Sequence, residues 1–258
     1  MVVDPVFGIA EIDEPFVPFL PVGWTGLISG STGTHLLAKQ FARVGIGTMP
    51  VLYYTTYERV ADVERAFHDF GWDASGMQVR NLAGEYYDEV LARELAIARV
   101  RDRGIRLDEL NGEDRVHVPP RSYDLPRRIV ADLAALDSRF RFVLDSVDFL
   151  LDVCPAPEVV NLARQVRYRA QALGGQAFLV IRPEIHDKRT TGALEDLSDV
   201  IVRLSAESST EGARLTVGID KVRNHPERGR LVHLGVGPTG LTVAGADGDP
   251  SATKSKSR

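Results

Sequence analysis

Several features are scarce or missing in this 258-residue chain, and each absence excludes a class of protein. The only cysteine is Cys154, so no internal disulfide can form, and the composition suits a reducing compartment such as the cytoplasm. No run of about 18 apolar residues occurs, so no membrane-spanning helix is expected. The net charge is −5, which argues against a broad nucleic-acid-binding surface. The first residues lack a basic segment, so no signal peptide is expected.

Metal and hydrolase motifs are also missing. The six histidines are scattered and no pair has the spacing of metal ligands, so a zinc site is not expected. No G-x-S-x-G turn occurs, which removes the usual nucleophile of an α/β-hydrolase. What remains is an ordinary globular composition, with 44% hydrophobic and 26% charged residues, at a length typical of one large domain.

Residues 27–41 have the pattern of a phosphate-binding loop that lacks its lysine. A short apolar strand, a glycine-rich turn and an amphipathic helix follow one another, as they do around the motif G-x-x-x-x-G-K-[ST]. In that motif the backbone N–H groups and the lysine hold the phosphates, and the Ser/Thr hydroxyl binds Mg²⁺. The candidate nucleotide-binding residues in this chain are Gly30, Ser31, Thr32, Gly33, Thr34 and His35.

Two alignments of this segment with the motif are open. Without a gap, His35 replaces the second glycine, Leu36 the lysine and Leu37 the hydroxyl residue. With a two-residue gap, the Gly-Lys pair is deleted and His35 replaces the Ser/Thr. We prefer the gap because the helix pattern that follows then stays in register. In both alignments the ammonium group is lost, which weakens nucleotide binding roughly tenfold to a hundredfold or more. Lys39 lies about one turn further along the helix and is not expected to compensate.

Alternating strand and helix patterns predict an α/β fold. Strands are expected at residues 24–29, 51–55, 77–81, 141–144, 177–181, 199–204, 214–220, 230–234 and 240–243. Helices are expected at residues 34–44, 60–70, 87–103, 125–136 and 157–173. Strands that alternate with helices form a mainly parallel sheet flanked by helices. The last strands have no helices between them, so they predict an antiparallel extension of the sheet.

The same patterns indicate the domain organisation. Residues 1–22 form a proline-rich N-terminal extension, residues 23–244 form the α/β domain, and residues 245–258 form a disordered tail. Residues 104–121 are polar and rich in turn-forming residues, which is typical of a surface loop. Residues 182–192 are expected to be a flexible surface loop, and their basic side chains are not expected to bind DNA.

Six short segments occur in a characteristic order and spacing. They are the loop and helix at 30–41, VLYYTTYE at 51–58, GWD at 71–73, RFVLDS at 141–146, LEDLSDVI at 194–201, and a segment at 215–223 that ends in KVR. Together they resemble the KaiC-like branch of the RecA superfamily of ATPases, over roughly residues 20–243. The resemblance implies a RecA-like sheet flanked by helices.

The resemblance also implies roles for residues outside the loop. Asp145 would hold Mg²⁺, or water bound to it, if nucleotide binds. The family's acidic pair after the second strand is Tyr57-Glu58 here, so Glu58 remains as a weak candidate for the general base. Lys221 and Arg223 match a Lys-x-Arg that reaches the γ-phosphate of a neighbouring subunit, with Arg223 as the finger. The structural alternatives are a turn cap for Asp145, a helix-terminal acid for Glu58 and a charged strand edge for Lys-x-Arg.

These features predict an ATPase-family protein with a defective phosphate loop, which serves as a non-catalytic or weakly nucleotide-binding regulatory or assembly subunit. ATP and Mg²⁺ are expected to bind weakly or not at all. A protonated His35 would supply part of the missing charge and would strengthen binding below about pH 6.5. The expected partner is another copy or a KaiC-like paralogue, and neither nucleic acid nor a membrane. The alternatives are an active but atypical ATPase and a DNA accessory protein similar to recombinase paralogues.

Overall fold

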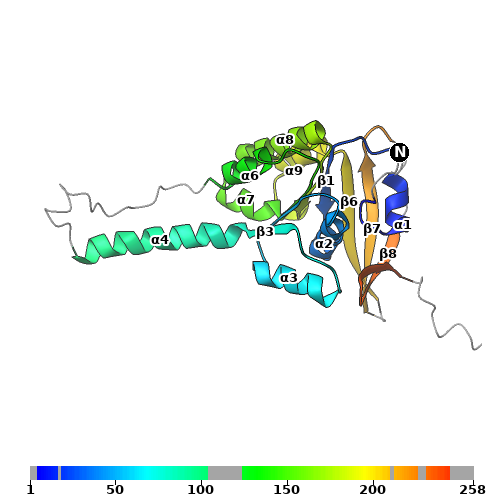
Figure 1. Cartoon of the computed structure of the whole chain (residues 1–258), viewed down its shortest axis with the longest axis horizontal. Helices are drawn as coiled ribbons and strands as arrows, with labels where there is room; N and C mark the ends of the chain where they lie inside the picture. The colour runs from blue at the N-terminus through cyan, green and yellow to red at the C-terminus, as the bar shows by residue number, and fades with distance from the viewer. Residues whose placement is uncertain (1–4, 17–18, 104–123, 210–211, 226–230, 245–258) are drawn as a thin grey trace, which may run out of the picture.

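The fold is built on one large mixed sheet, and a computed structural model describes it over residues 5–16, 19–103, 124–209, 212–225 and 231–244. In this part of the chain, nine strands pair in the order β3-β2-β4-β5-β1-β6-β7-β8-β9 (Figure 1). The strands are β1 (Trp24–Ser29), β2 (Val51–Thr55), β3 (Met77–Asn81), β4 (Arg141–Asp145), β5 (Gln176–Ile181), β6 (Val200–Ser209), β7 (Gly212–Val222), β8 (Val232–Gly237) and β9 (Gly240–Val243). The neighbouring strands β3, β2, β4, β5, β1 and β6 are parallel to one another. Strands β7, β8 and β9 extend the sheet in antiparallel pairs. The predicted fold class is therefore confirmed.

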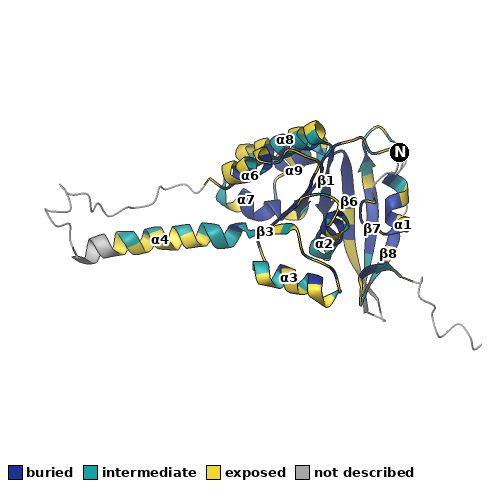
Figure 2. Cartoon of the chain, viewed as in Figure 1, coloured by how far each residue is buried: buried dark blue, intermediate teal, exposed yellow. Residues whose placement is uncertain are grey.

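Helices cover both faces of this sheet (Figure 1). The first face carries α1 (Ala10–Asp13), η1 (Glu14–Phe16), α2 (Thr34–Gly45) and α3 (Val60–Asp69). The second carries α6 (Leu125–Ala134), α7 (Val147–Val153), α8 (Ala156–Leu173) and α9 (Lys188–Leu197), and a short η2 (Pro183–Ile185) precedes α9. A long helix, α4 (Leu82–Arg103), leaves the body of the molecule, and most of its described side chains are exposed or half-buried (Figure 2). None of the described helices combines the length and hydropathy that a bilayer crossing requires.

The central strands contribute side chains to both apolar layers. In β2, Tyr53 packs in the layer under α2 and α3, whereas Leu52 and Tyr54 pack in the layer under α6 and α8. The same alternation places Val143 and Phe142 of β4 on opposite faces, because successive side chains of a strand point in opposite directions. Since both faces are covered by helices, these strands are continuous apolar runs, and for this reason the sequence predicted β1, β2, β4 and β5 to within one residue, whereas β6 extends five residues beyond its predicted end.

Residues 5–16 of the predicted N-terminal extension contribute side chains to the hydrophobic core. Phe7 and Phe16 are fully buried and pack together with the first apolar layer. The guanidinium of Arg141, also fully buried, donates hydrogen bonds to the backbone oxygens of Val6 and Phe41. Residues 5–16 are therefore held to the start of β4 and to α2. The predicted tail at 245–258 and the predicted loop at 104–121 lie outside the described residues.

The prediction of a flexible loop at residues 182–192 is wrong, because η2 and α9 occupy most of it. Asp187 caps α9, since its side chain accepts hydrogen bonds from the backbone N–H groups of Arg189 and Thr190. Thr190 and Leu194 are then buried against the body of the protein. Two threonines and Gly192 lower the helix propensity of this segment, but the cap and the burial outweigh that penalty.

Helix α7 was not predicted, and α4 begins five residues before its predicted start. Ser146 is the N-cap of α7, where its hydroxyl accepts a hydrogen bond from the N–H of Asp148. Asn81 has a similar place before α4, since its side chain accepts from the N–H of Gly84. Both caps are side-chain to backbone bonds of the kind that starts helices. The glycine and aromatic residues after Asn81 have low helix propensity, so the sequence pattern did not predict the true start of α4.

Candidate functional site

The predicted loop lies at the carboxyl ends of the central parallel strands, where open α/β sheets bind ligands. It joins β1 to α2 and lies close to the ends of β4 and β5, the strands that precede Ser146 and Arg182. A small cavity of about 110 Å³ opens there. Its walls include Gly30 and Thr34 from the loop segment and Tyr57 from the turn after β2. The structure thus brings several of the predicted site residues to one place.

The glycines of the loop are required by its backbone and by its neighbours. Gly30 and Gly33 have φ angles of +149° and +80°, in the region that favours glycine. A Cβ atom on Gly30 would lie 2.2 Å from the backbone oxygen of Leu204, and one on Gly33 would lie 3.0 Å from the side chain of Leu215. The loop is therefore packed directly against β6 and β7, which leaves no room behind it.

Asp145 is the most enclosed acidic group at the site. Its side chain is 1% exposed, and both carboxylate oxygens are engaged. Oδ1 lies 2.5 Å from Nδ1 of His35, and Oδ2 accepts a hydrogen bond of 2.7 Å from the hydroxyl of Tyr53. The hydrogen bond to Asp145 raises the pKa of His35, against the opposing effect of burial. Burial raises the pKa of the Tyr53 hydroxyl well above its usual value, so this group stays a neutral donor.

Lys39 and Glu58 form a second pair on the same side of the sheet. Nζ of Lys39 donates to Oε2 of Glu58 at 2.5 Å. The lysine side chain is 5% exposed and the glutamate side chain is 33% exposed. The neighbouring Tyr57 is exposed, and its ring centroid lies 5.6 Å from that of His35. The lysine nearest to the loop and the candidate general base therefore neutralise each other.

This pair makes a measurable prediction. Glu58→Gln is expected to destabilise the protein more than Lys39→Met, because it leaves a buried ammonium without its counter-ion. A double-mutant cycle is expected to give a coupling of about 1–2 kcal/mol, between the values for exposed and fully buried pairs. Urea unfolding of the unmodified protein, the two single variants and the double variant measures this coupling energy. A coupling below about 0.3 kcal/mol, the usual error of additivity, would contradict the pairing.

Asp148 forms a polar cluster that was not predicted from the sequence. It is buried, and its carboxylate accepts hydrogen bonds from the Ser146 hydroxyl at 2.9 Å and from the N–H of Arg182 at 3.0 Å. Nε2 of His186 lies 2.7 Å from the same carboxylate. Asp148 therefore joins the first turn of α7 to the segment after β5. Serine followed by an acid two residues later is an N-terminal helix signal, and it would have revealed α7 in the sequence.

Lys221 and Arg223 lie at the opposite edge of the sheet from the loop. They are at the end of β7, which runs antiparallel to β6 and so ends beside the amino end of that strand. Nζ of Lys221 donates to the backbone oxygen of Glu195 at 2.7 Å. Nε of Arg223 donates to buried Asp199 at 2.5 Å. The structure thus does not bring either side chain to the loop of its own subunit.

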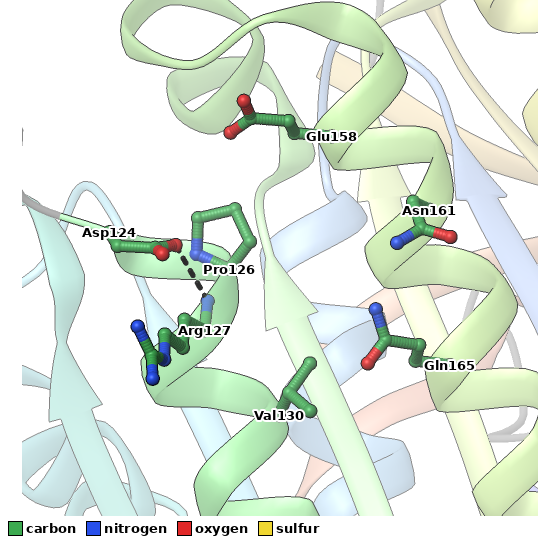
Figure 3. A pocket seen from close by; sticks show the side chains of 7 residues that line it. All are labelled: Asp124, Pro126, Arg127, Val130, Glu158, Asn161 and Gln165. Carbon is green, nitrogen blue, oxygen red and sulfur yellow. Dashed lines mark hydrogen bonds between the residues drawn. The ribbon is translucent and has the colours of Figure 1, made fainter.

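A larger cavity, of about 290 Å³, lies between α6 and α8 (Figure 3). Asp124 on its wall caps α6 by accepting from the N–H of Arg127, and the amides of Asn161 and Gln165 come from α8.

Burial, with smaller effects of nearby carboxylates, raises the pKa of the Cys154 thiol to about 11, so this thiol is not a reactive nucleophile. Among the residues that the structure describes, no group of three His, Cys, Asp or Glu side chains is placed to hold a metal.

A mostly parallel sheet with a glycine loop, a following helix and a strand-end aspartate at its carboxyl edge defines the RecA-like class of P-loop folds. Within that class, the chain belongs to the KaiC family of ATPases, because the family described as "ATPase: KaiC" matches residues 6–247. The crystal structure of a KaiC-like protein from the hyperthermophilic archaeon Pyrococcus horikoshii OT3 has the same fold, with a TM-score of 0.60 and 18% sequence identity. The match covers 94% of this chain and 99% of that one. Comparison with curated protein sequences gives no match.

Proposed function

We propose that this KaiC-family chain does not turn over ATP and serves as a regulatory or assembly subunit. One observation carries the proposal: Asp145, the carboxylate expected to hold Mg²⁺, is bonded through one oxygen to His35 and through the other to Tyr53. Mg²⁺ demands a near-ideal set of oxygen ligands and is usually held by carboxylates with free lone pairs. To bind here, it would have to displace a buried hydrogen bond from Tyr53 and a partly buried one from His35.

The other charged groups of the site support the same proposal. Lys39 is paired with Glu58, so the first does not reach a phosphate and the second is not free to activate water. Tyr57 stands where the family has an acid, so its exposed side chain supplies no carboxylate to activate water. The loop itself contains no lysine. The groups that hydrolysis needs are therefore absent or neutralised within the subunit.

The cavity is also a poor fit for a magnesium nucleotide. Its volume of about 110 Å³ is well below the ~300 Å³ at which small-molecule sites begin. The loop lies against β6 and β7, so it does not retreat to enlarge the cavity. We therefore assign no hydrolytic step to these residues.

The partner that we propose is a second copy or another KaiC-family chain. Lys221 and Arg223 lie at the edge of the sheet away from the loop, and the Arg223 side chain is 36% exposed. In this place they lie away from their own loop, and an arginine finger acting between subunits would require Arg223 to leave its partner Asp199. Sedimentation analysis over a range of concentrations tests self-association. A strictly monomeric chain would leave only a different family member as the partner.

The proposal predicts that the purified chain releases no phosphate from ATP in the presence of Mg²⁺ above the level of a buffer control. Asp145→Asn is expected to give the same background rate, because no metal is held there. A coupled phosphate-release assay on both proteins makes the measurement. Mg²⁺-dependent release that disappears in Asp145→Asn would instead show an active, atypical ATPase and would overturn the proposal.

A further inference from the structure

The cavity between α6 and α8, which we call the α6–α8 groove, has one wall of polar side chains. From α8 it is lined by Glu158, Asn161 and Gln165, whose spacing of three and four residues places them on one face of the helix. Figure 3 shows all three side chains directed from α8 toward α6. Within the described part of the chain, none of the three side chains makes a hydrogen bond or an ion pair. Their donors and acceptors are therefore open to a ligand.

The opposite wall of the groove is apolar. It is lined by Pro126 and Val130 of α6, which lie four residues apart. Arg127 also comes from this helix, but its guanidinium extends away from α8 (Figure 3). The volume of about 290 Å³ is close to the ~300 Å³ at which ligand sites begin. The two walls suit a ligand with apolar parts on one side and polar groups on the other.

One end of the groove carries negative charge. Asp124 and Glu158 lie at this end, where α6 and α8 begin. After burial, these two carboxylates are the groups that raise the pKa of the Cys154 thiol, so both act on the same place. One oxygen of Asp124 caps α6, and no described residue donates to the other. This end of the groove therefore suits a cationic side chain.

The two amides are spaced to match an extended peptide. Asn161 and Gln165 are four residues apart on α8, which is about 6 Å along the helix axis. In an extended chain, peptide groups that face the same side recur every two residues, at about 6.6 Å. Each amide can offer a donor and an acceptor to such a backbone. The same period of two directs alternate side chains of the peptide to one side.

We propose that the α6–α8 groove binds residues 250–258 of a second copy of this chain in an extended conformation. This segment, PSATKSKSR, has basic residues at Lys254, Lys256 and Arg258. Their period of two places them on one side of an extended chain, so a basic side chain meets the acidic end of the groove. The inference rests on the proposed function in one respect, because it names the surface that recognises the second copy.

The order of the strands favours a second copy over the same chain. The described residues end at Ala244, just after β9, and β9 is separated by β8, β7, β6 and β1 from β5, on which α8 packs. This separation is about 24 Å, and a helix of about 10 Å thickness adds to the path. Lys254 is ten residues beyond Ala244 and reaches at most about 35 Å when fully extended. Holding the chain so straight costs conformational entropy, which a second copy avoids.

The test is fluorescence anisotropy of a labelled synthetic peptide of residues 245–258, titrated with the full chain. That chain carries glutamine in place of Lys254, Lys256 and Arg258, so that its own segment does not compete. We expect saturable binding that weakens as salt is added, because the charges lie at the surface.

Variants of the groove in the same background test each wall contact. Asn161→Leu and Gln165→Met remove an amide at similar side-chain size, and each is expected to weaken binding about threefold to tenfold. Glu158→Gln is expected to weaken it about twofold to fivefold, as for an exposed ion pair. The matched control is Glu64→Gln, at an exposed position of α3 on the other face of the sheet, with an expected change of less than about twofold.

Each outcome decides the question. Binding that is weakened by the three groove variants but not by Glu64→Gln supports the inference. Absence of saturable binding, or an equal loss in Glu158→Gln and Glu64→Gln, overturns it. Sedimentation of the full chain decides the source of the segment. Weaker self-association when Lys254, Lys256 and Arg258 are replaced by glutamine supports a second copy, and unchanged self-association overturns it.

Failure of this inference is distinct from failure of the proposed function. The proposed function is decided by ATP turnover, which none of these variants is expected to change. A chain that releases no phosphate from ATP and binds no peptide in the α6–α8 groove retains the proposed function and loses only this inference.

Discussion

Replacing Arg141 with methionine is expected to lower the free energy of unfolding by about 3–5 kcal/mol. The side chain is fully buried, and its guanidinium donates to the backbone oxygens of Phe41 at 2.5 Å, Val6 at 2.9 Å and Pro5 at 2.5 Å. Methionine fills much of the same volume but leaves three carbonyl groups without these donors, at about 1–3 kcal/mol each before relaxation. The guanidinium also lies 4.4 Å from the centre of the Phe41 ring, so a cation–π contact is lost.

Urea unfolding followed by circular dichroism measures this change. Arg164→Met is the control, because Arg164 is exposed on α8 and its replacement is expected to change stability by no more than about 0.5 kcal/mol. Arg141→Lys keeps the charge but has one ammonium in place of a planar fork, so an intermediate loss is expected. A loss below about 1 kcal/mol in Arg141→Met would contradict the role of Arg141 in holding residues 5–16 to the core.

Replacing Asp199 with alanine is expected to lower the free energy of unfolding by about 2–4 kcal/mol. Its carboxylate is almost fully buried and accepts from the N–H of Thr25 at 3.1 Å. It also pairs with Arg223 at 2.5 Å and with Arg167 at 3.0 Å. Alanine leaves the buried N–H of Thr25 unsatisfied. The Arg223 and Arg167 side chains are 36% and 20% exposed, so solvent screens part of the two ion pairs that alanine removes. The expected change in the free energy of unfolding is therefore smaller than for a fully buried pair.

A double-mutant cycle with Arg223→Ala measures how much of this change belongs to one pair. We expect a coupling of about 1–2 kcal/mol, which lies between exposed and buried pairs. Asp199→Asn is the control, because it keeps an acceptor and removes the charge, and it is expected to lose about half as much as alanine. If Arg223→Ala leaves stability unchanged, Arg223 does not anchor β7, and its role is to be sought at a neighbouring subunit.

The elements that were predicted correctly are those marked by residues close together in the sequence. Strands β1, β2 and β3 were predicted at their observed bounds, because strands that are buried or bounded by turns stand out as apolar or β-branched runs. Helix α9 was not predicted, because its threonines and Gly192 disfavour a helix and only its cap and its burial against the body reverse that preference. The packing of Phe7 and Phe16 into the core was not predicted either, since nothing in a proline-rich segment indicates where it lies.

By itself, the sequence determined that the loop lacks a lysine, that an aspartate ends the fourth strand, and that the sheet is mainly parallel, because each of these depends on residues that are neighbours along the chain. Only the tertiary structure decided which charges meet. His35 and Asp145 are 110 positions apart, and Lys39 and Glu58 are 19 apart. Their contacts depend on the order of the strands in the sheet, which sets β1 beside β5 and β4 beside β2. The same order brings Arg182 to the loop, because the ends of parallel strands share one edge whatever their separation in sequence.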